Sequence, residues 1–68
     1  MKNFRDGDRV MYTYMGVKGS GVICGKTAYE DVLGTTYIVR DISDNYDTIG
    51  YSCFVVSAFS LRSEETYA

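Results

Sequence analysis

Short segments of alternating apolar and polar residues, separated by glycine-containing or polar turns, dominate this chain and favour β-strands over helices. In RVMYTYM, the side chains of Val10, Tyr12 and Tyr14 fall on one face of an extended segment. The segments Thr35–Ile42 and Tyr51–Ser57 are rich in β-branched and aromatic residues, which are typical of strands. With the shorter pieces SGVICG and FSLRS, the pattern predicts four to five short antiparallel strands.

The length of 68 residues allows one domain with a small core. Because so few short strands cannot form a useful two-layer sandwich, we predict an all-β fold in which one sheet rolls into a small barrel. The barrel is expected over residues 1–62, and residues 63–68 are expected to form a polar tail. The predicted core residues are Val10, Tyr12, Val22, Cys24, Val39, Phe54, Val56 and Leu61.

The sequence leaves three local structural features undecided. In the third strand, the core face carries either Tyr37 and Val39 or the alternate set that includes Ile38. The segment Thr27–Gly34 has a capping-box pattern and a closing glycine, which predicts a short helix, but a long hairpin loop fits equally well. Val56–Ser60 is long enough for one 3₁₀ turn. We therefore expect at most one short helix or 3₁₀ turn.

Four motifs in chain order resemble a small SH3-like β-barrel of the KOW or Tudor type. They are F-x-x-GDRV-x-Y, G-x-G-V-I-x-G, YIVRD and FVVSAFSLR, and together they span Phe4 to Arg62. In such domains a Gly-Asp-x-Val opening starts the first strand, and a 3₁₀ turn precedes the last one. The chain is also similar in length and style to small bacteriophage or bacterial accessory proteins. That likeness implies a regulator or inhibitor of a larger host complex.

The stretch GSGVICGKT, residues 19–27, is a near-miss of the phosphate-binding P-loop. Ser20 stands where the motif needs its first glycine, and β-branched residues occupy the part that would have to curl around phosphates. We interpret the stretch as a strand, with Gly16, Gly19 and Gly21 supplying a tight turn and close backbone approach. Lys26 is then expected to be exposed near a strand end.

The residue types argue against catalysis, metal binding and cofactor binding. The chain has no histidine, and the spacing of its aspartates in DISDNYD does not match a calcium loop. Cys24 and Cys53 lie in apolar segments and are predicted to be buried thiols in a reducing compartment, with a cross-strand disulfide as the alternative. The charged N-terminus and the lack of a long apolar run predict a cytoplasmic protein without a membrane partner.

The sequence therefore favours a non-enzymatic module that docks on another protein. Seven tyrosines are more than a small core needs, and tyrosine is frequent at protein interfaces. The region 27–68 holds two arginines against seven acidic residues, which suggests an acidic contact surface. The predicted contact residues are Tyr29, Glu30, Asp31, Asp44, Tyr46 and Asp47. The oligomeric state is left open.

Nucleic-acid binding is the alternative function, as the KOW-like resemblance implies. The region 1–26 holds five lysines and arginines against two aspartates, although the whole chain has a net charge of −2. Tyr12 or Tyr14 would stack on bases in this alternative. The residues expected to meet phosphates are Arg5, Arg9, Lys18 and Lys26.

Overall fold

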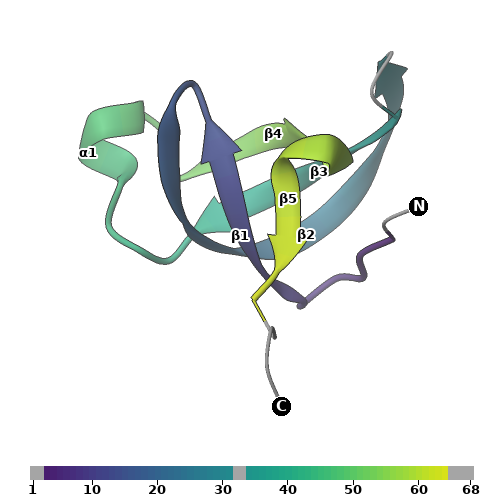
Figure 1. Ribbon diagram of the computed structural model, residues 1–68, viewed down its shortest axis with the longest axis horizontal. Helices are drawn as coiled ribbons and strands as arrows, with labels where there is room; N and C mark the ends of the chain where they lie inside the picture. Colours follow the sequence, from purple (N-terminus) through teal and green to yellow (C-terminus); the bar gives the residue numbers. More distant parts are fainter. Residues whose placement is uncertain (1–2, 32–33, 65–68) are drawn as a thin grey trace.

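The computed structural model describes residues 3–31 and 34–64, which form a single antiparallel sheet (Figure 1). The strands are β1 (Arg9–Tyr14), β2 (Val17–Asp31), β3 (Gly34–Asp41), β4 (Cys53–Ser57) and β5 (Leu61–Ser63). Their order across the sheet is β4-β3-β2-β1-β5. One helical turn, α1 (Tyr46–Ile49), lies between β3 and β4, and a 3₁₀ turn, η1 (Ala58–Ser60), lies between β4 and β5. The predicted all-β class is confirmed, and the sheet has five of the predicted four to five antiparallel strands.

Aromatic contacts show that the sheet curls over its own core. Phe54 on β4 packs edge-on against Tyr12, with ring centroids 5.0 Å apart, and stacks on Tyr14 at 4.5 Å. Two strands separate β4 from β1 in the sheet order, so these rings can meet only if the sheet bends strongly. Figure 1 shows this curvature, with β5 crossing in front of the sheet. The buried apolar residues are Val10, Tyr12, Ile23, Tyr37, Val39, Phe54, Val56, Ala58 and Leu61.

The glycines of the first hairpin have two separate roles. At the two-residue turn, Met15 and Gly16 have φ values of 51° and 82°, and such left-handed turns match the twist of paired strands. Further along β2, a Cβ atom on Gly21 would lie 2.5 Å from Val39 Cγ1 and 2.8 Å from the Arg40 carbonyl oxygen. At Gly19 it would collide with neighbouring polar side chains. The predicted tight turn and close backbone approach are both confirmed.

The predicted core face of β2 is wrong. Ile23 is buried, Val22 is only half-buried and Cys24 is exposed. The cause is the pairing of Val10 with Gly21, which places Gly21 and Ile23 on the core side of the sheet. A glycine has no side chain that could have marked this face in the sequence. On β3 the open choice resolves in favour of Tyr37 and Val39, which are buried.

The helix considered for Thr27–Gly34 does not form. Residues 27–31 continue β2, Gly34 opens β3, and residues 32–33 between them lie outside the described part. A side-chain hydrogen bond between Thr27 and Thr36 joins the two strands across a region of irregular register. Pairing with β3 thus prevails over the local capping signal in the described part of this segment.

The last part of the chain follows the sequence prediction closely. The 3₁₀ turn forms at Ala58–Ser60, and the Ser57 hydroxyl accepts a hydrogen bond from the Phe59 amide at 3.2 Å. This contact is a capping interaction, which explains why the turn starts there. Strand β5 runs to Ser63, one residue into the predicted polar tail, and residues 65–68 lie outside the described part.

Both cysteines are exposed, so the prediction of two buried thiols is wrong. Cys24 lies on β2 and Cys53 on β4, with β3 between them. Two strand spacings amount to about 9.6 Å, which exceeds the roughly 7 Å between Cα atoms that a disulfide tolerates. This geometry also excludes a disulfide between Cys24 and Cys53 in the folded chain.

Candidate functional site

A groove of about 320 Å³ lies on the outer side of β1, between the end of the β1–β2 hairpin and the turn η1. We call it the β1–β5 groove. Its lining residues are Met11, Tyr12, Thr13, Lys18, Phe59, Ser60 and Arg62.

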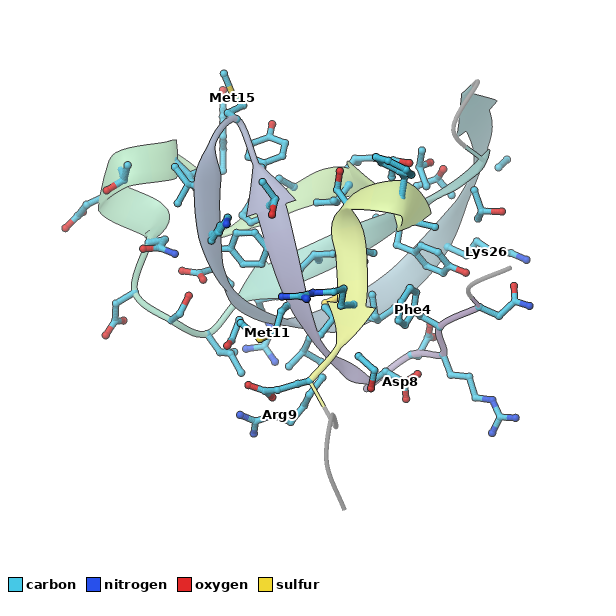
Figure 2. All side chains as sticks on the ribbon, viewed as in Figure 1. Phe4, Asp8, Arg9, Met11, Met15 and Lys26 are labelled. Atoms are coloured by element: carbon cyan, nitrogen blue, oxygen red, sulfur yellow. The ribbon has the colours of Figure 1, made fainter. Side chains whose placement is uncertain are left out.

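Strand pairing explains why these residues meet. Met11 and Thr13 alternate with the buried Tyr12 and therefore face outward. Across the sheet, Met11 pairs with Arg62 on β5, and Thr13 pairs with Lys18 on β2. Figure 2 labels Met11 beside β1, between Met15 at the top of the view and Arg9 at the bottom. Residues that are distant in sequence thus form one surface because β5 returns to pair with β1.

Phe59 supplies the largest exposed apolar surface of the groove. Its side chain is 70% exposed, whereas Ala58 and Leu61 beside it are buried in the core. The capped 3₁₀ turn directs these two residues inward and leaves the Phe59 ring in solvent. Met11, 36% exposed, lies in the same groove. An exposed aromatic ring held by a fixed turn is a common feature of binding surfaces.

The cations on this face fall into two groups. Arg9 Nε lies 2.7 Å from Glu64 Oε1, and the second carboxylate oxygen of Glu64 accepts a hydrogen bond from Ser20 Oγ at 3.1 Å. These hydrogen bonds from Arg9 and Ser20 lower the pKa of the Glu64 carboxyl. Lys18 and Arg62 have no ion-pair partner among the described residues. The groove therefore presents two positive charges that no described residue pairs.

The predicted phosphate-contacting residues do not form one patch. Arg9 and Lys18 lie on the outer face of β1 and β2, but Arg5 belongs to the segment that precedes β1. Lys26 pairs with Tyr37 beyond a bulge in β2, and Figure 2 shows it at the right of the view, apart from Arg9 at the bottom.

The two tyrosines proposed as base-stacking platforms are largely used by the core. Tyr12 is 1% exposed, so its proposed stacking on bases is wrong for the folded chain. Tyr14 is half-buried, and one face of its ring is stacked on Phe54. The alternation in β1 places Tyr14 on the same face as Tyr12, which the sequence already predicted to be a core residue.

The predicted acidic contact residues lie at opposite ends of β3. The backbone of Tyr29, Glu30 and Asp31 forms the distal end of β2, whereas Asp44 and Asp47 follow the other end of β3 (Figure 1). Asp44 and Asp47 are exposed. The side chains of Tyr29, Glu30, Asp31 and Tyr46 lie outside the described part. The structure therefore does not bring these residues together on one surface.

A polar cluster ties the β3–β4 connection to the first hairpin. Asp41 accepts hydrogen bonds from Tyr12 Oη at 2.7 Å and Ser43 Oγ at 2.7 Å through one oxygen, and from the Asn45 amide at 2.7 Å through the other. The Asn45 side chain also donates to the Lys18 carbonyl oxygen at 3.0 Å. Both oxygens of Asp41 are thus occupied by donors, which indicates a structural role.

The cluster shifts two pKa values in opposite directions. Burial raises the pKa of the Tyr12 hydroxyl, with the neighbouring Asp41 carboxylate adding to the effect. Burial also opposes ionisation of Asp41, but hydrogen bonds from Ser43 and Tyr12 outweigh it and lower the pKa of that carboxyl. Asp41 is therefore held as an anion that accepts from its neighbours.

Sequence reasoning missed Phe59, Arg62 and Met11 as site residues. The alternation in FSLRS carried the usable signal, because a buried Leu61 directs Arg62 outward. Locating Arg62 beside Met11 also required the pairing of β5 with β1, which no local pattern contains.

Comparison with protein-family models, with curated proteins and with solved structures finds no match for this chain. Within residues 3–31 and 34–64, no helix is long and apolar enough to span a membrane. The same residues contain no group of three side chains that could hold a metal ion.

Proposed function

We propose that this chain is a non-enzymatic, SH3-like binding module that docks on another protein through the β1–β5 groove. One observation carries the proposal: the 70% exposed ring of Phe59 lies in a groove with Lys18 and Arg62, which have no ion-pair partner among the described residues. Exposed aromatic and arginine side chains are enriched where proteins bind each other.

The strand order and the 3₁₀ turn before β5 support the SH3-like part of the proposal, as does the motif resemblance. We propose no catalytic step, because the described residues that line the groove include no carboxylate, thiol or imidazole. The likeness to small phage accessory proteins makes a larger host complex the expected target.

Quantitative affinity capture from a lysate of the source cells tests this proposal. Phe59→Ser removes the exposed ring of the groove, and Tyr51→Ser removes a ring that is 65% exposed and does not line it. We expect the Phe59 variant to lose partner proteins that the wild type and the Tyr51 variant both retain. An identical set of captured proteins for all three baits would contradict docking through this groove.

Nucleic-acid binding is a second candidate, because Arg9, Lys18 and Arg62 lie on the same face as the exposed Phe59 ring. With Arg9 held by Glu64, two cations remain to contact phosphates. The logarithm of the binding constant for single-stranded DNA should then fall with the logarithm of salt concentration at a slope of about −1.4. A gel-shift series at several salt concentrations measures that slope, and no shift at low salt would exclude this candidate.

A further inference from the structure

We propose that the β1–β5 groove recognises an acidic peptide segment that carries one large apolar side chain. This inference rests on the proposed docking function and names the chemistry of the partner. The juxtaposition of Lys18 and Arg62 with Phe59 and Met11 carries it.

Charge selects an acidic partner. Lys18 and Arg62 reach the groove from β2 and β5, so they flank the outward residues of β1 from both sides. Glu64, a carboxylate on this face, is engaged with Arg9 and Ser20 and does not line the groove. Two carboxylates of an extended segment could therefore pair with the two cations without displacing an existing ion pair.

The apolar lining selects a bulky side chain between those carboxylates. Phe59 is 70% exposed and Met11 is 36% exposed, so a ligand ring would cover apolar surface that now faces water. The volume of about 320 Å³ is at the low end of the roughly 300–1,000 Å³ typical of ligand pockets. A groove of this volume suits the side chains of a short peptide segment.

The remaining surface disfavours a long polyanion. Arg9 is already paired with Glu64, and the chain carries a net charge of −2. Asp6, Asp8 and Asp47 are exposed elsewhere on the molecule. A nucleic acid that extended past the groove toward these aspartates would meet negative charge, whereas a short acidic segment ends within the groove.

The experiment is a titration of ¹⁵N-labelled full-length protein followed by amide chemical shifts. The probes are synthetic peptides of equal length with the sequences Asp-Asp-Phe-Asp-Asp, Asp-Asp-Ser-Asp-Asp and Lys-Lys-Phe-Lys-Lys, together with a short oligothymidylate. We expect the first peptide to shift the amides of Met11, Lys18, Phe59 and Arg62. The serine peptide should bind more weakly, and the lysine peptide should leave these amides unshifted.

Charge reversal provides the matched controls. The double variant Lys18→Glu/Arg62→Glu should weaken binding of the acidic phenylalanine peptide about tenfold and gain affinity for the lysine peptide. Arg40→Glu reverses an exposed charge on β3 outside the groove and should change affinity less than about twofold. Lys18→Gln removes one positive charge without reversing it and should weaken binding of the acidic peptide by a smaller factor. The amide spectrum of each variant checks that it is folded.

Three results would overturn the inference. In the first, the groove amides do not shift at millimolar concentrations of the acidic phenylalanine peptide. In the second, Arg40→Glu weakens binding of that peptide as much as the double variant does. In the third, oligothymidylate binds at the same amides more tightly than the peptide. If affinity capture still depends on Phe59 while the acidic peptide fails, the docking function stands and only this partner chemistry is wrong. If capture fails as well, the docking function is also wrong.

Discussion

Tyr12 lies directly opposite Gly19 across the β1–β2 hairpin, and a Cβ atom on Gly19 would lie only 2.7 Å from the Tyr12 hydroxyl. The same atom would collide with the side chains of Ser43 and Asn45. Glycine at this position therefore leaves the space in which the hydroxyl of a buried tyrosine meets the polar cluster around Asp41. The glycine-rich stretch that resembles a P-loop is, at this position, a packing feature.

The first prediction concerns this space. Gly19→Ala should lower the free energy of unfolding by about 1–3 kcal/mol, because the added methyl group forces the cluster or the backbone to move. Gly25→Ala is the matched control, since a Cβ atom there meets only Ile38 Cδ1 at 3.9 Å, an ordinary contact. Urea unfolding followed by tyrosine fluorescence measures both. Equal loss of stability in the two variants would show that the close approach at Gly19 is not the cause.

The second prediction concerns the pH dependence of the Asp41 cluster. The pKa of Asp41 is lowered below its usual value of 3.8, so its ionised form stabilises the fold. That contribution is complete above the unfolded-state pKa and is lost as pH falls through the lower, folded-state pKa. The difference in unfolding free energy between wild type and Asp41→Asn should therefore be largest near neutral pH and shrink below about pH 3.8.

Urea unfolding at a series of pH values measures that difference. Asp47→Asn is the control, because Asp47 is exposed and is not part of the cluster. A difference for Asp41→Asn that stays constant from neutral to acid pH would contradict a stabilising role for the ionised carboxylate.

The extent to which the sequence predicts this fold depends on how local each signal is. Alternation in β1 and the 3₁₀ turn after Ser57 are encoded by neighbouring residues, and both are confirmed. The prediction for the core face of β2 was wrong because Gly21 has no side chain to mark the face on which it lies. Val22 and Cys24 therefore looked like the apolar face. Only the pairing of Gly21 with Val10 reveals that Ile23 is the core residue.

The site was harder to predict than the fold because its residues converge through non-local pairing. Lys18 was identified from its charge, but Arg62 became relevant only when β5 was seen to pair with β1. Phe59 looked like one more apolar residue in a C-terminal strand segment. Its exposure follows from the turn geometry between buried Ala58 and Leu61. Composition therefore suggested that the chain binds a partner, whereas strand order determines where the proposed groove lies.

The third prediction concerns the thiols. Because Cys24 and Cys53 are both exposed, both should react with a thiol reagent in the folded protein at rates close to those of an unfolded chain. Reaction in native buffer and in denaturant, followed by mass spectrometry, compares the two rates. A thiol that reacts only after denaturation would contradict its exposure, and a linked pair of these cysteines within the folded chain would contradict the strand order.

The fourth prediction separates two phenylalanines that composition cannot distinguish. Phe54 is 6% exposed and contacts both Tyr12 and Tyr14, so Phe54→Ala should cost about 3–5 kcal/mol of stability and could unfold so small a domain. Phe59 is 70% exposed, so Phe59→Ala should change stability by less than about 0.5 kcal/mol.

Thermal and urea unfolding of both variants test this contrast, with the milder Phe54→Leu keeping the core measurable if Phe54→Ala does not fold. A large loss of stability in Phe59→Ala would mean that the ring supports the turn η1 and the packing of Leu61. The ring would then be structural, and its exposure would no longer argue for a docking surface. If Phe59→Ala is about as stable as the wild type but no longer captures the partner proteins, the Phe59 ring would instead be assigned to binding.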